Sequence, residues 1–333
     1  MRFLIAGYGF TARRHLRNLR SLGENDVLFY DPTPGARPSG DLAPYPLETD
    51  LRAALDRHPD AVIIANPTAQ RMDVAIPAAE AGCDLLIETP VAQDLGRAEE
   101  LRAALRQGGG RAMSAYPFRF HPGMQRIQQL VARGAVGEIA SVRAHWGEYL
   151  PASQRSGDYR TTAGRPEPGG GVVLTLSHPF DYLRWLLGEV EDLWAYTANS
   201  SILNVPVETV AEVGLRFRRG ALGTLHLDFL QRPPRHHLEL IGTMGTLSWD
   251  NNTGAARLYN SAIGTWESYL PPQDFRQNDV YKEELRAFIS VVRREIEPPC
   301  TLEDGLAALR LALSVKRAAE GGQILSLSDD HHF

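Results

Sequence analysis

The sequence predicts an α/β protein of two parts, with a doubly wound parallel sheet first and an α+β domain with a mostly antiparallel sheet after it. Three observations support this prediction. Short apolar runs alternate with amphipathic segments in the first third, which is typical of βαβ units. A glycine-containing turn links the first apolar run to a helical pattern. Beyond residue 120, strand-like runs follow one another with turn signals between several of them.

The N-terminal strands are expected to be covered on both faces, because they are nearly continuous apolar runs. They are predicted at residues 2–8, 26–31, 61–66, 84–88 and 111–116. Helices are predicted between them at residues 11–22, 51–57, 69–81 and 95–106. We therefore assign a first domain to residues 1–118 and a second to residues 119–333.

The second domain begins with a helix at 122–133 and a long strand at 139–150. A Gly- and Pro-rich loop at 155–171 then leads into a strongly apolar segment, which predicts a single helix over 172–187. Further strands are predicted at residues 192–198, 210–217, 222–230, 237–241 and 246–250. Two helices, at 280–294 and 302–319, close the domain.

Composition narrows the class of protein. A formal net charge of −5 argues against a nucleic-acid or membrane-surface partner. No apolar run approaches the roughly 18 residues of a membrane span. The two cysteines, Cys83 and Cys300, cannot build a disulfide framework, and no Cys/His spacing resembles a zinc site. We therefore expect a cytoplasmic protein without a bound metal.

The first turn carries a dinucleotide-binding fingerprint, Gly7-Tyr8-Gly9-Phe10-Thr11-Ala12. Gly7 permits a tight turn, Gly9 lets the backbone approach a pyrophosphate, and Ala12 is small enough for close helix–strand packing. The phosphates would then bind the N–H groups of the following helix, at Phe10 and Thr11 among others. A strand before the turn and a helix after it make this a Rossmann domain rather than an ordinary turn.

The second predicted strand ends at Asp31, which lies 22 residues beyond Gly9. Its carboxylate can accept hydrogen bonds from the ribose hydroxyls and would repel a 2′-phosphate, which favours NAD over NADP. Arg37, in the following loop, could instead accept that phosphate. NADP therefore stays possible.

Beyond this fingerprint, the chain resembles the Gfo/Idh/MocA oxidoreductase family over nearly its whole length. The matching motifs are His15 after the fingerprint, Asn66-Pro67-Thr68, Glu88-Thr89-Pro90, Arg119-Phe120-His121-Pro122, Gly134-Ala135-Val136-Gly137, and Gly169-Gly170-Gly171 running on to Ser177-His178. The resemblance implies a large C-terminal sheet that carries substrate recognition and subunit packing. It also implies a small-molecule substrate, sugar-derived or biosynthetic, and a homo-oligomer (dimer or tetramer).

The resemblance also implies an active site, and here the chain departs from the family. The usual catalytic lysine is replaced by Thr89 and the usual aspartate by Thr175, so that only His178 remains. The family's histidine after the Pro-Thr turn is replaced by Arg71. A threonine hydroxyl cannot act as a base near neutral pH, so His178 is the best candidate for proton transfer. A core histidine without a catalytic role is the competing interpretation.

If residues 172–187 form one helix, then Thr175, His178, Tyr182 and Trp185 share a face. The resemblance implies that this face points toward the nicotinamide. Asn66, Pro67 and Glu88 are further predicted cofactor contacts, with Glu88 and Pro90 shaping the backbone near the nicotinamide and a possible cis bond before Pro90. Candidate substrate contacts are Tyr116, Arg119, Tyr159, Arg160 and Tyr182, although a plain structural role fits most of them as well.

Three functions remain open. The first is NAD(P)-dependent hydride transfer to or from a ketone or imine, and an imine would tolerate Thr89 better because it builds no alkoxide charge. The second is an enzyme that retains NAD and carries out net non-redox chemistry, as an epimerase or lyase does. The third is a non-catalytic dinucleotide-binding protein.

Overall fold

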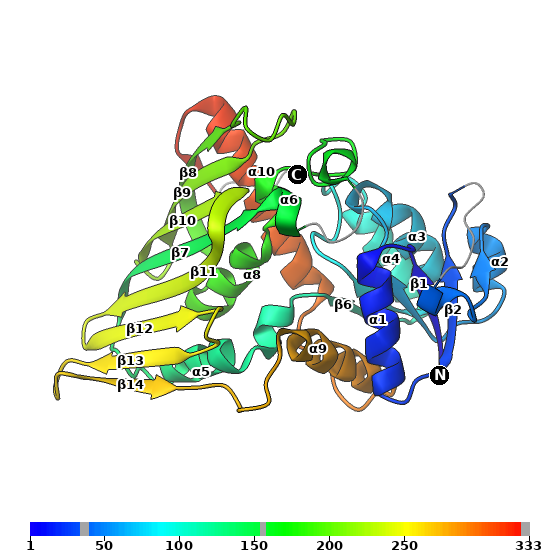
Figure 1. Cartoon of the computed structure of the whole chain (residues 1–333), viewed down its shortest axis with the longest axis horizontal. Helices are drawn as coiled ribbons and strands as arrows, with labels where there is room; N and C mark the ends of the chain where they lie inside the picture. The colour runs from blue at the N-terminus through cyan, green and yellow to red at the C-terminus, as the bar shows by residue number, and fades with distance from the viewer. Residues whose placement is uncertain (34–39, 154–157, 328–333) are drawn as a thin grey trace. The chain divides into compact units, whose positions relative to one another are not determined.

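The computed structural model describes residues 1–33, 40–153 and 158–327, and Arg37 lies outside them. The chain divides into two compact units (Figure 1). Unit 1 comprises Met1–Pro117 together with Gln277–Leu306, and unit 2 comprises Phe118–Arg276 together with Ala307–Phe333. Unit 1 includes residues 277–306, which the sequence analysis assigned to the second domain.

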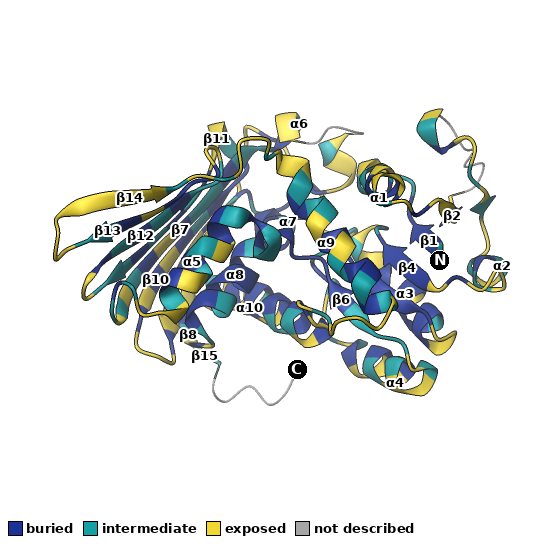
Figure 2. Cartoon of the chain, turned by 90° about the horizontal axis from the view of Figure 1, so that it is seen from below, coloured by how far each residue is buried: buried dark blue, intermediate teal, exposed yellow. Residues whose placement is uncertain are grey.

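Unit 1 is built on a six-stranded, wholly parallel sheet in the order β3-β2-β1-β4-β5-β6. This is the doubly wound order of dinucleotide-binding domains. The strands are β1 (Arg2–Ala6), β2 (Asp26–Tyr30), β3 (Leu47–Glu48), β4 (Ala61–Ile64), β5 (Asp84–Ile87) and β6 (Ala112–Ser114). The central strands are buried throughout, as their apolar runs predict (Figure 2).

Helices and short 3-10 turns connect these strands. They are α1 (Phe10–Ser21), η1 (Gly40–Leu42), α2 (Leu51–Leu55), η2 (Thr68–Gln70), α3 (Arg71–Glu80), α4 (Ala98–Gly108) and, after unit 2, α9 (Gln277–Val292). α9 packs on α1. There the Arg14 guanidinium lies 3.8 Å from the centre of the Tyr281 ring, and Asn278 Nδ2 donates to Asn18 Oδ1 at 2.7 Å.

Unit 2 contains a nine-stranded sheet in the order β14-β13-β12-β11-β7-β10-β9-β8-β15. Only the β7–β10 pair is parallel. The strands are β7 (Ile139–Tyr149), β8 (Val190–Ala198), β9 (Val210–Phe217), β10 (Leu222–Asp228), β11 (Leu230–Gly242), β12 (Gly245–Asp250), β13 (Ala256–Asn260), β14 (Thr265–Tyr269) and β15 (Leu325–Ser326). The mostly antiparallel sheet is confirmed, with β13, β14 and β15 as additional strands.

Helices cover one face of this sheet, where α5, α8 and the second part of α10 lie (Figure 1). The helical elements are η3 (Pro117–Phe120), α5 (Pro122–Ala132), α6 (Leu150–Ser153), η4 (Tyr159–Thr161), α7 (Val172–Thr175), α8 (His178–Leu187) and α10 (Leu302–Gly321), within which the boundary between the units falls. Side chains alternate along the strands between the helix-covered face and the opposite face, which we call the open face. Leu225 and Leu227 of β10 are buried, whereas Thr224 on the open face is exposed.

The prediction of a single helix over 172–187 is wrong. α7 ends at Thr175, and α8 begins at His178 after a break at Leu176, whose ψ is 44°. Pro179 explains the break, because it has no N–H to donate to the carbonyl of Thr175. Of the four residues expected on one helical face, Thr175 therefore lies on a separate helix from His178, Tyr182 and Trp185.

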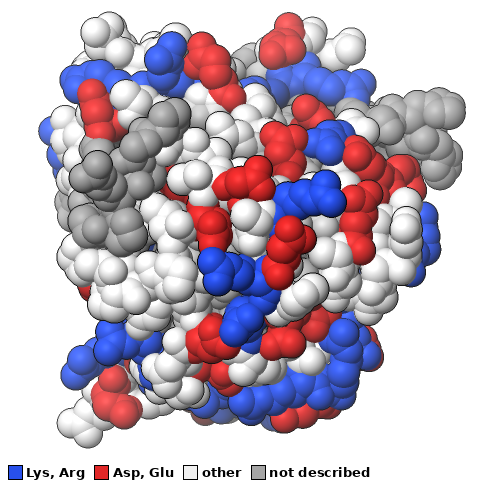
Figure 3. Space-filling view, turned by 90° about the vertical axis from the view of Figure 1, so that its right-hand side faces the viewer, with Lys and Arg blue, Asp and Glu red and all other residues white. Residues whose placement is uncertain are grey.

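Acidic and basic side chains are interspersed on the face of the molecule shown in Figure 3, with no broad basic surface. Within the described ranges, no helix combines the length and apolar character that crossing a bilayer requires.

Candidate active site

The fingerprint turn of unit 1 begins directly after β1. Gly7 adopts φ +105°, and its N–H donates to the Tyr30 carbonyl at 2.8 Å. A Cβ at this position would lie 2.9 Å from the carbonyl oxygen of Ala65. Because an L side chain would be strained here and would collide with backbone, the turn requires glycine.

The turn leads into the N-terminus of α1, and Gly9 is the N-cap residue. No side chain caps this end, and Ala12 is completely buried against the sheet. Phe10 is partly exposed, at 39%. A helix N-terminus without a side-chain cap presents backbone N–H groups and a positive dipole end, so this cradle fits a pyrophosphate.

Asp31 follows β2 directly and is partly exposed. One of its carboxylate oxygens accepts a hydrogen bond from the Thr33 N–H at 2.9 Å. This bond fixes the carboxylate at the carboxyl end of a parallel strand, where a ribose binds in this fold.

Asn66 and Pro67 shape the next turn. The Asn66 amide nitrogen donates to the Gln70 carbonyl at 2.9 Å, and Pro67 precedes η2. The Asn66 side chain is buried and holds its own turn. Its expected cofactor contact therefore stays a prediction.

The Glu88 carboxylate belongs to an ion cluster inside unit 1. Glu88 Oε1 lies 2.6 Å from His15 Nε2 and 3.0 Å from Arg14 Nη2, and its side chain is 13% exposed. Burial alone would raise the pKa of Glu88, but the His15 hydrogen bond and the charges of Arg14, His15 and Arg71 hold it well below its usual range. The side chain is thus an internal anchor, and only the Glu88 backbone remains for the role predicted near the nicotinamide.

Arg71 organises the segment around Thr89. Its Nε donates to the Asn66 carbonyl at 3.2 Å, and its Nη1 donates to the Glu88 carbonyl at 2.7 Å and to the Pro90 carbonyl. Burial lowers the pKa of Arg71 to about 10, although Glu88 and Tyr116 oppose the shift, so the group stays charged at neutral pH. The arginine at the family's histidine position thus holds the chain on both sides of Thr89. In the sequence, Arg71 stands out only as a charged residue at the start of an apolar helix and as the replacement of the family's histidine.

Thr89 itself precedes a cis peptide bond to Pro90. Its Oγ1 donates to the Ala115 carbonyl at 3.4 Å, and the side chain is partly exposed. Tyr116 follows Ala115 and is buried. A hydroxyl in this position can donate a hydrogen bond but has no base strength near neutral pH.

His178 lies in unit 2, at the first residue of α8. Its ring stacks on Trp146 of β7 at 5.5 Å and meets the edge of Phe118 at 5.4 Å. Trp146 also stacks on His236 of β11 at 4.4 Å, with the two rings 8° from parallel. Aromatic neighbours on adjacent elements therefore hold the imidazole, which stays partly exposed.

Tyr182 and His236 lie behind this cluster and are buried. The Tyr182 hydroxyl and His236 Nε2 are 3.2 Å apart. Burial raises the pKa of Tyr182, whereas burial and then the proximity of His178 lower that of His236 well below its usual value. Both groups are therefore neutral near pH 7, and the expected substrate contact of Tyr182 becomes a contact with His236. Sequence reasoning did not find Trp146, Phe118 or His236. Strand register places Trp146 of β7 beside His236 of β11, and Phe118 reaches His178 from η3, so only the tertiary fold brings them together.

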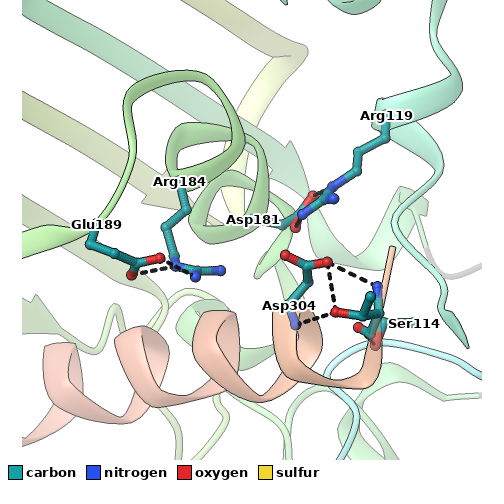
Figure 4. A network of polar contacts seen from close by, with 7 residues as sticks. Ser114, Arg119, Asp181, Arg184, Glu189 and Asp304 are labelled. Carbon is teal, nitrogen blue, oxygen red and sulfur yellow. Dashed lines mark hydrogen bonds and ion pairs between the residues drawn. The ribbon is translucent and has the colours of Figure 1, made fainter. Parts of the chain in front are cut away.

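Two arginines near α8 are already paired (Figure 4). Arg119 makes a two-pronged ion pair with Asp181, at 2.9 and 2.5 Å, and its side chain is 9% exposed. Arg184 pairs likewise with Glu189. A structural role for Arg119, rather than a substrate contact, is thus supported, because Asp181 neutralises its charge inside unit 2.

Tyr159 and Arg160 form η4. The Arg160 guanidinium lies 4.6 Å from the centre of the Tyr159 ring, and its Nη1 is 3.4 Å from Asp158. Arg160 is exposed, unlike Arg119. It is therefore the arginine better placed to meet an anionic ligand.

Comparisons with known proteins agree with this architecture. A family model described as "Oxidoreductase family, NAD-binding Rossmann fold" matches residues 1–116, and the Gfo/Idh/MocA C-terminal domain matches residues 124–248. The 1,5-anhydro-D-fructose reductase of Ensifer adhaerens is 28% identical over 271 residues, which cover 79% of this chain and 78% of the relative. The myo-inositol 2-dehydrogenase of Thermotoga maritima is 25% identical over 283 residues, covering 82% and 81%.

Solved structures show the same fold. A levoglucosan dehydrogenase in complex with NADH and levoglucosan superposes with a TM-score of 0.87 at 16% identity, over 98% of this chain and 99% of the other. The WlbA dehydrogenase of Bordetella pertussis, in complex with NADH and UDP-GlcNAcA, gives 0.83 at 23% identity, over 98% of both chains. The Rossmann turn, the order of both sheets and the two family matches agree, and the chain is an NAD-binding oxidoreductase that belongs to the Gfo/Idh/MocA family.

Proposed function

We propose that the protein transfers hydride between a nicotinamide dinucleotide and a small, polar, sugar-derived substrate with a ketone or imine carbon. The observation that carries this proposal is His178, a partly exposed imidazole held by Trp146 and Phe118. It is the remaining acid–base group of the family's set, because Thr89 and Thr175 occupy the lysine and aspartate positions. The named relatives, a reductase of 1,5-anhydro-D-fructose and a dehydrogenase of myo-inositol, support the substrate class.

The residues of unit 1 fit the dinucleotide. The turn at Gly7 and Gly9 and the first turn of α1, at Phe10, Thr11 and Ala12, would hold the pyrophosphate. Asp31 would accept hydrogen bonds from the ribose, which favours NAD over NADP. When bound, the dinucleotide supplies the hydride acceptor or donor.

His178 moves the proton. Its imidazole accepts the proton of a carbinol hydroxyl during oxidation, or donates one to the forming oxygen during reduction. Thr89 of unit 1 and Thr175 of unit 2 can each donate a hydrogen bond, but they neutralise no alkoxide. An imine carbon builds no alkoxide charge, so this residue set favours a C=N substrate over a ketone. Tyr116, Tyr159 and Arg160 are proposed substrate contacts, with Arg160 suited to a carboxylate or phosphate.

The test uses 1,5-anhydro-D-fructose, myo-inositol and levoglucosan with NADH or NAD⁺, followed by the absorbance of reduced nicotinamide. His178→Gln should lower kcat by about 10²–10⁴-fold and leave dinucleotide affinity unchanged. Thr89→Lys should raise the turnover of carbinols, whereas the matched variant Thr89→Val should stay within a few-fold of the native enzyme. An unchanged kcat in His178→Gln would refute the role of His178.

The same experiment separates two other functions that the threonines at 89 and 175 leave open. Substrate consumed without a net change in nicotinamide absorbance identifies an epimerase or lyase that retains NAD. Tight dinucleotide binding without consumption of these sugars or of a cyclic imine added to the panel favours a non-catalytic binding protein.

We also propose that the chain forms a homo-oligomer, a dimer or tetramer, through the nine-stranded sheet. On the open face, Trp194 and Tyr196 of β8 and Leu222 of β10 are large exposed side chains toward one end of the sheet. Such an apolar surface is typical of an interface. Trp194→Glu should reduce the mass measured by light scattering, whereas Ile263→Glu, at an exposed turn, should not.

A further inference from the structure

A row of charged and imidazole side chains crosses the open face of the nine-stranded sheet. In strand register, Glu212 of β9 pairs with His226 of β10, His226 with His145 of β7, and His145 with His237 of β11. Three histidines on consecutive strands thus lie side by side. A groove of about 440 Å³ runs along them, lined also by Arg143, Thr224, Arg235 and Glu239.

Within this row, His145 and His226 meet Asp228. His226 Nε2 is 3.0 Å from Asp228 Oδ2, and one ligand atom from each of the three residues lies within 4.8 Å of the other two. A tetrahedral zinc site with bonds of about 2.0–2.2 Å needs its ligand atoms roughly 3.3 Å apart. The His226–Asp228 pair has nearly this spacing, and the separations from His145, at most 4.8 Å, would shorten to it when the ion binds.

The surroundings orient these ligands as outer residues do in metal sites. The second ring nitrogen of His226, Nδ1, lies 2.5 Å from Glu212 Oε1, which matches the carboxylate–histidine arrangement that fixes a metal-binding tautomer. The second oxygen of Asp228, Oδ1, accepts from the Leu230 N–H at 2.7 Å and leaves Oδ2 directed at His226. Gln231 Oε1, 2.5 Å from His145 Nε2, provides a further oxygen.

The backbone makes room for these oxygens. Gly147 of β7 pairs with Asp228, and a Cβ there would lie 2.1 Å from Asp228 Oδ2 and 2.3 Å from Gln231 Oε1. Any other residue would push both oxygens out of the cluster. The glycine therefore leaves room for both oxygens beside β7.

The local charge also suits a cation. Arg143 pairs with Glu239 at 3.4 Å, so the remaining charged side chains are Glu212 and Asp228 against Arg235. With neutral histidines, one negative charge is left over. Two imidazoles and one or two oxygens are the ligands of a borderline divalent ion, Zn²⁺ above all, rather than of Mg²⁺ or Ca²⁺.

We propose that His145, His226 and Asp228 bind a divalent transition metal ion on the open face of the sheet, with Glu212 as a positioning residue and Gln231 Oε1 as a fourth ligand. The ion would join β10 to β7 through their side chains and to the start of β11. The site involves none of the residues proposed for hydride transfer.

The test uses the untagged full chain with His331→Ala and His332→Ala as background, which removes a second possible metal-binding pair of histidines. After metal removal and addition of Zn²⁺, we expect one zinc per chain by elemental analysis. Co²⁺ in its place should give visible absorption bands of a site with nitrogen and oxygen ligands.

Substitutions on this background identify the ligands. His226→Gln and His145→Gln should each weaken Zn²⁺ binding by at least a hundredfold, and Glu212→Gln by about tenfold to a hundredfold. The matched control is His237→Gln, the next histidine of the row, which should bind Zn²⁺ as the parent does. Circular dichroism checks that each variant is folded. Substoichiometric zinc, or zinc binding that survives both His226→Gln and His145→Gln, would overturn the proposal and leave His226 as an imidazolium between two carboxylates.

Discussion

Titratable groups are buried in two ways in this molecule. In unit 1, Glu88 is surrounded by the cations of Arg14 and Arg71 and by His15, and the pKa of Glu88 falls despite its burial. In unit 2, His121 and His236 are buried among aromatic rings, and burial lowers their pKa values.

The difference shows what each arrangement is suited to. Opposite charges in unit 1 fix one ionisation state, and Arg71 holds the backbone on both sides of Thr89. His121 and His236 in unit 2 are instead kept neutral by burial. Neither arrangement takes up a proton at neutral pH, but His121 takes one up as the pH falls toward 4, before Glu88 does.

The largest expected effect comes from breaking the charge cluster. Glu88→Gln should lower the free energy of unfolding by about 3–5 kcal/mol, because Arg14 and Arg71 stay buried with less compensation. Urea denaturation at pH 7 measures it. Glu100→Gln, which removes an exposed carboxylate paired with Arg97, is the control and should change stability by less than about 1 kcal/mol. A loss that small in Glu88→Gln would show that the cluster is not energetically coupled.

A smaller effect should appear in unit 2 as pH falls. His121 caps α5 by accepting from the Gly123 N–H at 3.0 Å, and burial lowers its pKa to about 4. Below the ordinary histidine pKa of about 6.5, the unfolded chain binds a proton that the folded chain does not. Stability from this group is therefore complete above pH 6.5 and is lost as pH falls toward 4, by at most about 3 kcal/mol.

His121→Asn tests this slope, because asparagine can still cap the helix. Between pH 7 and pH 5, the free energy of unfolding should fall less steeply with pH in this variant than in the native protein. His58→Asn, at an exposed histidine with φ 52°, controls for the loss of an imidazole as such. An unaltered slope in His121→Asn would contradict the assignment.

The smallest effect concerns the stacked rings. Trp146→Leu removes the stacking on both His178 and His236, and it should lower the free energy of unfolding by about 1–3 kcal/mol, since each aromatic pair is worth about 0.5–1.5 kcal/mol beyond burial. Trp146→Phe should restore part of this loss. Near-UV circular dichroism would show the change in ring packing, and equal stability of all three proteins would contradict a role for the stack.

Local signals in the sequence predict much of this molecule. Gly7 and Asp31 were predictable because turn, strand and helix follow each other within a few residues. Pro179 predicts the break before His178, whereas the continuous apolar pattern over 172–187 favours a single helix.

Long-range register explains what was not predicted. Trp146 of β7 and His236 of β11 are neighbours only because their strands pair. In the same way, His145 lies beside His226 and Asp228, although it is at least 81 residues away from them in the sequence. Arg71 was predicted only as a replacement, because the carbonyls that it binds follow from the fold of the Glu88–Pro90 segment.

The path of the chain through the two units has a consequence for synthesis. Unit 1 is interrupted after Pro117 and is completed only by Gln277–Leu306. On the ribosome, the whole core of the nine-stranded sheet therefore emerges before α9 can cover α1. During that interval the growing chain lacks the partner of Arg14 and Asn18 on α9, and a fragment ending at residue 117 would lack it permanently. We expect such a fragment to aggregate on expression, because α1 is left uncovered. A separate peptide of residues 277–306 should bind α1 and reduce this aggregation.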